Sequence, residues 1–224
     1  VLPGIAASIA GPWVWLSYLV AGVFVLPALM SKAELATAMP VAGGTYVYVE
    51  RSMGPWMGTI TGLGTWFSLS AKTAFALVGL GGYLVLFSTA DPLLVSTSIL
   101  LLMIVLNILG ATKASLLQTI IVFACIAGLL VFFVAGGLQV QPALQTPAFP
   151  RGAAGILGGA GFVFVSYAGV TKICSVAEEI RNPERNIPLG MFLAQGTVMV
   201  IYAAVTWVIT GNVPFETLSS DVAP

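Results

Sequence analysis

Charged residues divide this chain into long apolar runs. Seven stretches without Asp, Glu, Lys or Arg extend over positions 1–31, 52–71, 73–90, 92–112, 114–150, 152–171 and 186–215. About 20 apolar residues suffice to cross the hydrocarbon core of a bilayer. The runs are apolar on every face, whereas the strands of a membrane barrel alternate apolar and polar residues. The pattern therefore predicts membrane-spanning helices and argues against an all-β structure.

Six spans fit these runs and predict an all-α integral membrane protein. We place them at positions 10–33, 55–88, 93–111, 114–136, 154–180 and 187–211. The second is long enough to require tilt or a cytoplasmic extension. Segment 41–54 is expected to be an interfacial or re-entrant piece, and Asn186 and Pro188 are expected to cap and open the last span. We treat residues 1–224 as a single transmembrane domain.

The fifth predicted span carries the features of a discontinuous helix. Six glycines lie between positions 152 and 169, and the twelve residues 177–188 hold five of the sixteen charges in the chain. A helix that unwinds inside the membrane releases carbonyl and amide groups that can hold a polar ligand, an arrangement typical of secondary transporters. We place the break at 167–171. For the glycines before Phe162, close helix packing is the favoured interpretation.

Composition strengthens the membrane assignment and removes several functions. Apolar residues make up 58% of the chain, charged residues 7%, and the mean hydropathy is +1.04, whereas soluble domains carry about 25% charged residues. The formal net charge is zero and histidine is absent, which excludes a basic nucleic-acid surface and imidazole chemistry. A nucleotide-binding GxxxxGK loop is also missing. We expect no catalytic residues, no metal, no cofactor and no nucleic-acid partner.

The distribution of Lys and Arg predicts the orientation of the spans. One set of alternate loops holds six basic residues, namely Lys32, Arg51, Lys113, Lys172, Arg181 and Arg185. The other set holds only Arg151, so by the positive-inside rule the first span runs from outside to inside. Positions 1–4 then look like the end of a preceding apolar segment. We expect the chain to be an internal fragment of a longer protein.

Two motifs resemble signatures of the amino acid, polyamine and organocation (APC) transporter superfamily. Positions 33–55 contain Ala-Glu-Leu-Ala, then Met-Pro-Val-Ala-Gly-Gly-Thr-Tyr-Val-Tyr and Met-Gly-Pro, similar to the signature of the second helix. Positions 167–188 contain Tyr-Ala-Gly, Ala-Glu-Glu and Asn-Pro-x-Arg, similar to the signature of the sixth helix. The resemblance implies a transporter of five-plus-five inverted repeats, of which this chain supplies helices two to seven. It also implies alternating access and a multi-pass protein of the plasma membrane, in contact with lipid.

The resemblance further implies where the substrate binds. A free amino acid or related amine would be held by unwound backbone of helices one and six, and only the latter lies in this chain. The residues carried over by the motif are Ser166, Tyr167, Ala168, Gly169, Val170 and Thr171. Val170 stands where the family often has Phe, and Thr171 replaces a common acid. Small Val170 leaves room for a moderately bulky substrate, and Trp66 is deep enough in its span to form a wall of the path.

Lys72 is a second candidate for a functional residue. It lies near the middle of the second predicted span, about 25 Å along the helix from Pro55, and an intramembrane charge is by default a functional hypothesis. Desolvation favours the neutral form of lysine. Lys72 could therefore couple transport to protons, or its ammonium could replace a sodium ion. A structural partner for a carboxylate or for helix-end carbonyls is the alternative, and exchange of a second amino acid is another mode of coupling.

Five charged residues at the cytoplasmic ends of the spans form a predicted inner gate. They are Glu34, Glu178, Glu179, Arg181 and Arg185. Paired carboxylates can serve as general acids and bases, but ion pairs and helix-end contacts are the better interpretation here.

Two classes of function remain open. The favoured class is a secondary transporter of amino acids or related amines. The alternative is a channel or a non-transporting membrane scaffold. A channel favours polar-lined pores or repeated carbonyl filters, whereas this chain carries one broken helix and one intramembrane cation.

Overall fold

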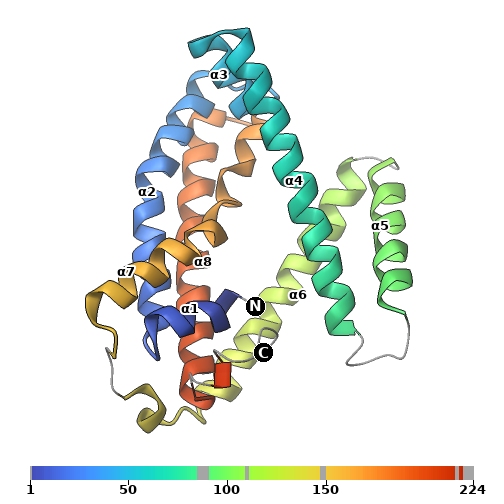
Figure 1. The fold of residues 1–224 in the computed structure, drawn as a ribbon. Helices are drawn as coiled ribbons and strands as arrows, with labels where there is room; N and C mark the ends of the chain where they lie inside the picture. Colours follow the sequence, from blue (N-terminus) through green and yellow to red (C-terminus); the bar gives the residue numbers. More distant parts are fainter. Residues whose placement is uncertain (1, 85–90, 109–110, 147–149, 215–216, 219–224) are drawn as a thin grey trace. The chain divides into compact units, whose positions relative to one another are not determined.

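A computed structural model describes residues 2–84, 91–108, 111–146, 150–214 and 217–218. The described ranges are helical and contain no strand, as Figure 1 shows. The α-helices are α1 (Leu2–Ala10), α2 (Val14–Ala38), α3 (Thr45–Met53), α4 (Pro55–Leu84), α5 (Pro92–Ile108), α6 (Ala111–Gly137), α7 (Gly152–Val163) and α8 (Pro183–Asn212). The 3-10 helices are η1 (Pro142–Gln145), η2 (Phe164–Tyr167) and η3 (Val170–Glu179).

Five segments of the described chain are long and apolar enough to cross a membrane. They are Val14–Ala38, Pro55–Gly81, Leu116–Gly137, Gly152–Glu179 and Pro183–Asn212. The predicted span 93–111 corresponds to α5, whose 17 residues fall short of the usual length of about 20. The all-helical membrane fold is therefore confirmed, while the count of six spans and the repeat assignment stay predictions.

The chain divides into two compact units. Unit 1 consists of Val1–Tyr48 and Ala127–Pro224, and unit 2 of Val49–Ile126. In unit 2, α4 packs against α5, where the hydroxyl of Ser96 donates a hydrogen bond of 2.9 Å to the carbonyl of Leu77. Unit 1 holds the interrupted span and is the part of the fold that positions the candidate site.

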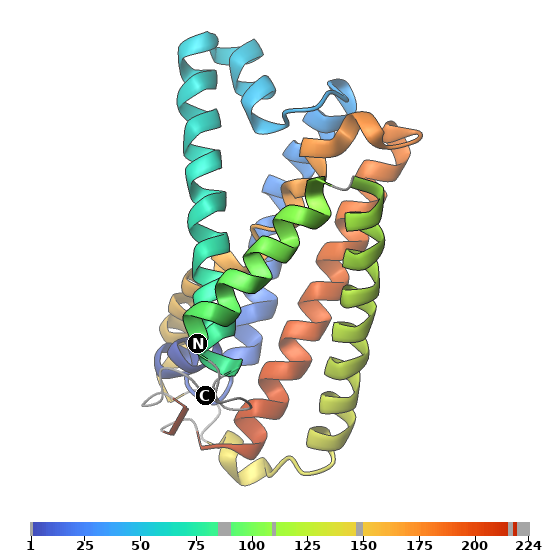
Figure 2. The ribbon, with the colours of Figure 1, turned by 90° about the vertical axis from the view of Figure 1, so that its right-hand side faces the viewer.

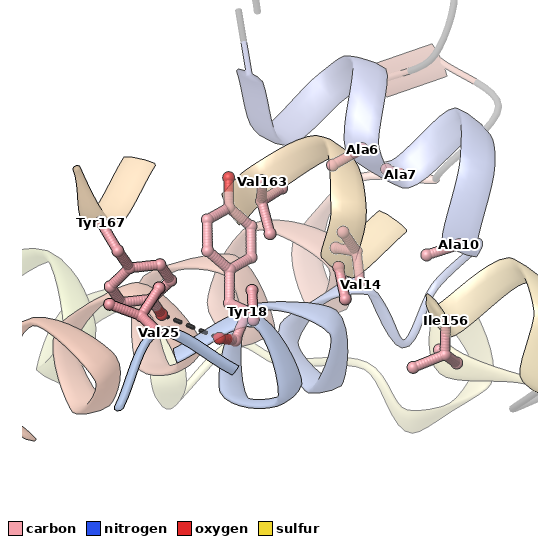
Figure 3. Close-up of a cluster of buried hydrophobic side chains, with 11 residues drawn as sticks. Ala6, Ala7, Ala10, Val14, Tyr18, Val25, Ile156, Val163 and Tyr167 are labelled. Carbon is pink, nitrogen blue, oxygen red and sulfur yellow. Dashed lines mark hydrogen bonds between the residues drawn. The ribbon is translucent and has the colours of Figure 1, made fainter. Parts of the chain in front are cut away.

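The antiparallel pair of α2 and α8 is the frame of unit 1. Both views show these helices side by side, and α2 also packs against α7 (Figures 1 and 2). Two buried clusters follow one another along α2. The first cluster consists of Ala6, Ala7, Ala10, Val14, Tyr18, Ala21, Val25, Ile156, Ala160, Val163 and Tyr167 (Figure 3). The second cluster consists of Leu29, Ala33, Ala36, Tyr48, Cys174, Ala177, Ile187 and Met191.

Glycines in α7 allow the short helix α1 to pack closely against it. A Cβ atom at Gly155 would lie 3.1 Å from the carbonyl oxygen of Ile9, and one at Gly159 would lie 2.9 Å from the Cβ of Ala10. The packing interpretation of these glycines is thus confirmed. The helix α1 itself was not among the predicted spans, and it ends at the left-handed Gly11 (φ +82°).

The start of α8 differs from the sequence prediction. The helix begins at Pro183, behind Asn182 in a left-handed conformation (φ 50°, ψ 60°), and Pro188 lies inside it. The predicted span 187–211 lies within α8, but the prediction that Asn186 caps the helix is wrong. Pro183 fills the first helical position, where its missing N–H costs nothing. The side-chain amide of Asn186 instead donates to the carbonyl of Arg181.

Candidate functional site

The span from Gly152 to Glu179 is interrupted near its middle. Regular α-helix ends at Val163, and the chain continues as the 3-10 segments η2 and η3. The backbone then bonds at shorter spacing, for example from Lys172 N to Gly169 O at 3.1 Å. Val176 has non-helical dihedral angles (φ −119°, ψ 22°), which adds a kink inside η3. The predicted discontinuity is confirmed, and it begins before the predicted 167–171.

The local sequence explains why the α-helix ends here. Residues 162–165 alternate Phe and Val, and aromatic and β-branched side chains lose rotamer freedom in a helix. Gly169 follows and adds backbone freedom. A segment of low helix propensity is thus placed inside an apolar span whose ends are held by α1 and α8.

Tyr167 fastens the break to α2. Its side chain is fully buried, and its hydroxyl donates a 2.8 Å hydrogen bond to the backbone carbonyl of Tyr18, drawn as a dashed line in Figure 3. The ring of Tyr167 packs edge-on against the ring of Tyr202 on α8, with centroids 5.5 Å apart. The ring of Tyr18 also packs against Tyr202, with centroids 5.6 Å apart. The residue is therefore committed to packing and anchors the break on α2 and α8.

The next residues expose the backbone of the break. Ala168 and Gly169 are exposed, and a Cβ added to Gly169 would meet no described atom within 4 Å. Val170 packs partly against the second cluster. Ser166 is partly buried, and its hydroxyl has no hydrogen-bond partner among the described residues. The side chain of Thr171 lies outside the described residues.

The two remaining residues predicted for substrate and coupling lie on α4. Trp66 is 67% exposed, and Lys72 is also exposed. Both belong to unit 2, whereas the break belongs to unit 1. Of the predicted site residues, those of the break lie in unit 1, and Trp66 and Lys72 lie in unit 2. The roles of Trp66 and Lys72 stay predictions.

The C-terminal end of the interrupted span, which is predicted to be cytoplasmic, contacts the end of α2 and the loop that follows. The carboxylate of Glu178 accepts a hydrogen bond of 3.2 Å from the backbone N–H of Ala42. The thiol of Cys174 donates to the carbonyl of Lys32 at 3.8 Å, and the ammonium of Lys32 donates to the hydroxyl of Thr45 at 3.3 Å. Glu178 and Cys174 thus contact backbone groups, and Lys32 contacts a side-chain hydroxyl.

The other predicted gate residues are placed at the same end of unit 1. Glu34 lies on α2, Glu179 ends η3, and Arg185 lies in the first turns of α8. These three side chains and Arg181 are exposed. Their gating role stays a prediction.

Close packing also occurs at the loop before α3. Gly44 has a left-handed backbone (φ +52°), and a Cβ there would lie 3.3 Å from the backbone N and Cα of Ser175. Only glycine fits this approach without displacing η3. Gly44 of the first motif thus lies against the interrupted span.

A buried glutamine on α8 was missed by the sequence analysis. Gln195 is 1% exposed, and its Nε2 donates a 3.0 Å hydrogen bond to the carbonyl of Gly22 on α2. A similar bond joins the hydroxyl of Ser17 to the carbonyl of Ile156 at 2.9 Å. An amide side chain inside an apolar span was the signal available in the sequence.

The site offers backbone groups rather than side-chain ligands. Unwound backbone in a membrane span can hold both an ammonium and a carboxylate, through free carbonyls and amides. In the part of the chain that the structure describes, no group of three or more His, Cys, Asp or Glu residues could hold a metal ion.

Comparison with known proteins gives the family. The family model described as "Amino acid permease" matches residues 3–223. The branched-chain amino acid permease BcaP of Lactococcus lactis is 29% identical over 250 residues, which cover 100% of this chain and 54% of that protein. BcaP of Bacillus subtilis is 30% identical, covering 96% and 51%. The methylthioribose transporter of Bacillus subtilis is 26% identical, again covering 96% and 51%.

The chain spans about half the length of these curated relatives. The match runs through the break, both predicted motifs and the apolar helices, and all three relatives are named as permeases or transporters. This protein is an integral, multi-pass membrane protein and not an enzyme, and it belongs to the amino acid permease family.

Proposed function

We propose that the permease containing this chain carries amino acids or related amines across the plasma membrane by secondary active transport. The observation that supports this most is the change from α-helix to 3-10 helix at Val163 inside an apolar span. Exposed Ala168 and Gly169 follow directly, so main-chain groups are accessible beside a buried anchor. Alternating access would then move the rest of the transporter around this fixed binding segment.

We further propose a substrate with an apolar side chain. Residues 164–171 carry no charge, so the break itself offers no counter-ion for a charged side chain. Val170 and Ala168 are small and apolar, which suits a branched aliphatic group. Two of the relatives are named for branched-chain amino acids.

Lys72 is the proposed coupling residue. It is the only charged residue inside the span Pro55–Gly81, and a charge inside a membrane span marks a candidate site of ion or proton coupling. Two modes of coupling are considered, coupling to protons and exchange of a second amino acid. Uptake measured across a pH series distinguishes them.

A pair of glycine substitutions tests the proposed site. Gly169 and Gly161 both have open space around an added Cβ, so Gly169→Leu and Gly161→Leu are both expected to preserve the packing of unit 1. Only Gly169→Leu covers the exposed backbone of the break. We expect it to raise the KM for leucine uptake at least about tenfold, the equivalent of about 1.4 kcal/mol of lost binding, while Gly161→Leu stays near wild type.

Counterflow in proteoliposomes is the assay. The complete permease is reconstituted, loaded with unlabelled leucine and diluted into labelled leucine. Saturable accumulation by the wild type supports a carrier. Non-saturable flux would instead support the channel alternative. Equal KM values for the two glycine variants would show that the break is not part of the binding site.

A further inference from the structure

Three elements of unit 1, namely α2, the interrupted span and α8, contribute side chains to both buried clusters. On each of them the boundary between the two clusters falls at the same level. On α2 the first cluster ends with Val25 and the second begins with Leu29. On the interrupted span Tyr167 belongs to the first cluster and Val170 packs against the second. The break thus lies at the boundary between two apolar cores.

Gln195 occupies this boundary on α8. Met191, one turn before it, belongs to the second cluster, while Met199, one turn after it, packs against the first. The glutamine is therefore a polar side chain inserted between two apolar layers. A polar group in the membrane interior is costly unless its hydrogen bonds are satisfied.

Only one of the two polar atoms of the Gln195 side chain has a hydrogen-bond partner among the described residues. Its Nε2 donates to the carbonyl of Gly22 at 3.0 Å, whereas its Oε1 has no partner among the described residues. An unused acceptor on a side chain that is 1% exposed is rare enough in folded proteins to need a functional or structural reason.

The carbonyls of Tyr18 and Gly22 place Gln195 next to the break. Tyr18 and Gly22 are four residues apart on α2, so their carbonyls share one face and are separated by about 6 Å along the axis. Tyr167 of η2 binds the first carbonyl, and Gln195 of α8 binds the second. The two donors come from different elements and meet neighbouring turns of the same helix.

The spacing between α2 and α8 is tight at this level. A Cβ atom at Gly22 would lie 2.8 Å from the sulfur of Met199, so a side chain at position 22 would have to displace the side chain of Met199. The absence of a side chain lets Gln195 reach the backbone of α2. The hydrogen bond between Gln195 and Gly22 therefore depends on the register of α8 relative to α2.

We propose that Gln195 is a positioning residue of the substrate site, an inference that rests on the proposed transport function. Its Nε2 holds α8 in register with α2 one turn away from the Tyr18 carbonyl that binds Tyr167 of the break. The glutamine thereby keeps the unwound backbone in the geometry that binds the amino acid. It acts on the substrate through residues 164–170 and does not touch it.

The test compares Gln195→Met with Thr206→Val in the complete permease. Methionine keeps the length of the side chain and removes both hydrogen-bonding groups. Thr206 is equally buried on α8, but its hydroxyl donates within its own helix, to the carbonyl of Tyr202. Both variants thus remove a buried polar group from α8, and only the first removes one at the break.

The readouts are the KM and maximal rate of leucine uptake and the amide hydrogen exchange of the peptide covering residues 164–171. For Gln195→Met we expect a KM about tenfold higher, a maximal rate within about twofold, and faster exchange of this peptide. Thr206→Val should leave all three unchanged. Should Gln195→Met fail to fold, Gln195→Asn keeps the polar groups, withdraws them by one methylene, and is expected to give the same changes.

Two results would overturn the proposal. Unchanged KM and unchanged exchange in Gln195→Met would show that the glutamine does not hold the break. A raised KM with unchanged exchange would point to direct substrate contact instead of positioning. If the wild type transports no amino acid, the proposed function fails, and the exchange comparison still decides whether Gln195 orders the break.

Discussion

Removal of a single hydroxyl, in Tyr167→Phe, measures how firmly the break is attached to α2. The hydroxyl donates at 2.8 Å to the carbonyl of Tyr18 from a fully buried position. A hydrogen bond of this kind contributes about 1 kcal/mol net, equivalent to a factor of about 5 in an equilibrium constant. The aromatic packing on Tyr202, at 5.5 Å between centroids, is retained by phenylalanine and lost in Tyr167→Ala, which should cost about 3–5 kcal/mol in total.

Thermal denaturation and uptake by the complete permease provide the assay. Tyr167→Phe should lower the apparent Tm by at most about 4 °C and raise the KM up to about fivefold, because the unwound backbone loses an anchor. Tyr167→Ala should prevent accumulation of folded protein. Tyr202→Phe is the control, since the described residues include no hydrogen-bond partner for its hydroxyl. If Tyr202→Phe has the larger effect, or if Tyr167→Phe matches wild type in both measurements, the anchoring argument is refuted.

Three further predictions concern packing, pH and coupling. Gly22→Ala should destabilise the permease by about 1–3 kcal/mol through overpacking, and Met199→Ala in the same protein should restore part of the loss, as a double-mutant cycle in thermal denaturation will show. On α3, burial, assisted by the nearby Cys174 thiol, raises the pKa of Tyr48 above 10.0. The folded state then holds this proton more tightly than the unfolded state, so stability should fall as the pH rises above about 10. Tyr48→Phe should flatten that fall in melting curves recorded from about pH 8 to about pH 11. Lys72→Ala should abolish the pH dependence of leucine uptake, and an unchanged pH profile would contradict proton coupling.

Local features of the sequence were sufficient to predict the membrane class and the discontinuous helix. Long charge-free runs can be read directly, and the five spans of the described chain lie mostly within such runs. The run of Phe and Val at 162–165 followed by Gly169 weakens a helix by local terms alone. These properties depend on residues that are close in sequence, which is why no tertiary information was needed.

Helix boundaries set by competing local signals were harder to predict. Asn186 and Pro188 looked like the start of the last span, yet Asn182 and Pro183 offer the same chemistry four to five residues earlier, and α8 begins there. The short helix α1 was missed because nine residues are too few to give a spanning signal. Its helical form is stabilised by packing on α7, which only a folded chain provides.

The sequence by itself determined that this protein is a bundle of membrane helices with one interruption and the motifs of an amino acid permease. Only the tertiary structure decided which faces meet. Because lipid and protein interior are equally apolar, the spans show no polar side that would mark their packing surface. The pairing of Tyr167 with Tyr18 joins residues 149 apart, and that of Gln195 with Gly22 joins residues 173 apart. Such bonds form between side chains and carbonyls of distant helices, so their partners are defined only once those helices have packed together.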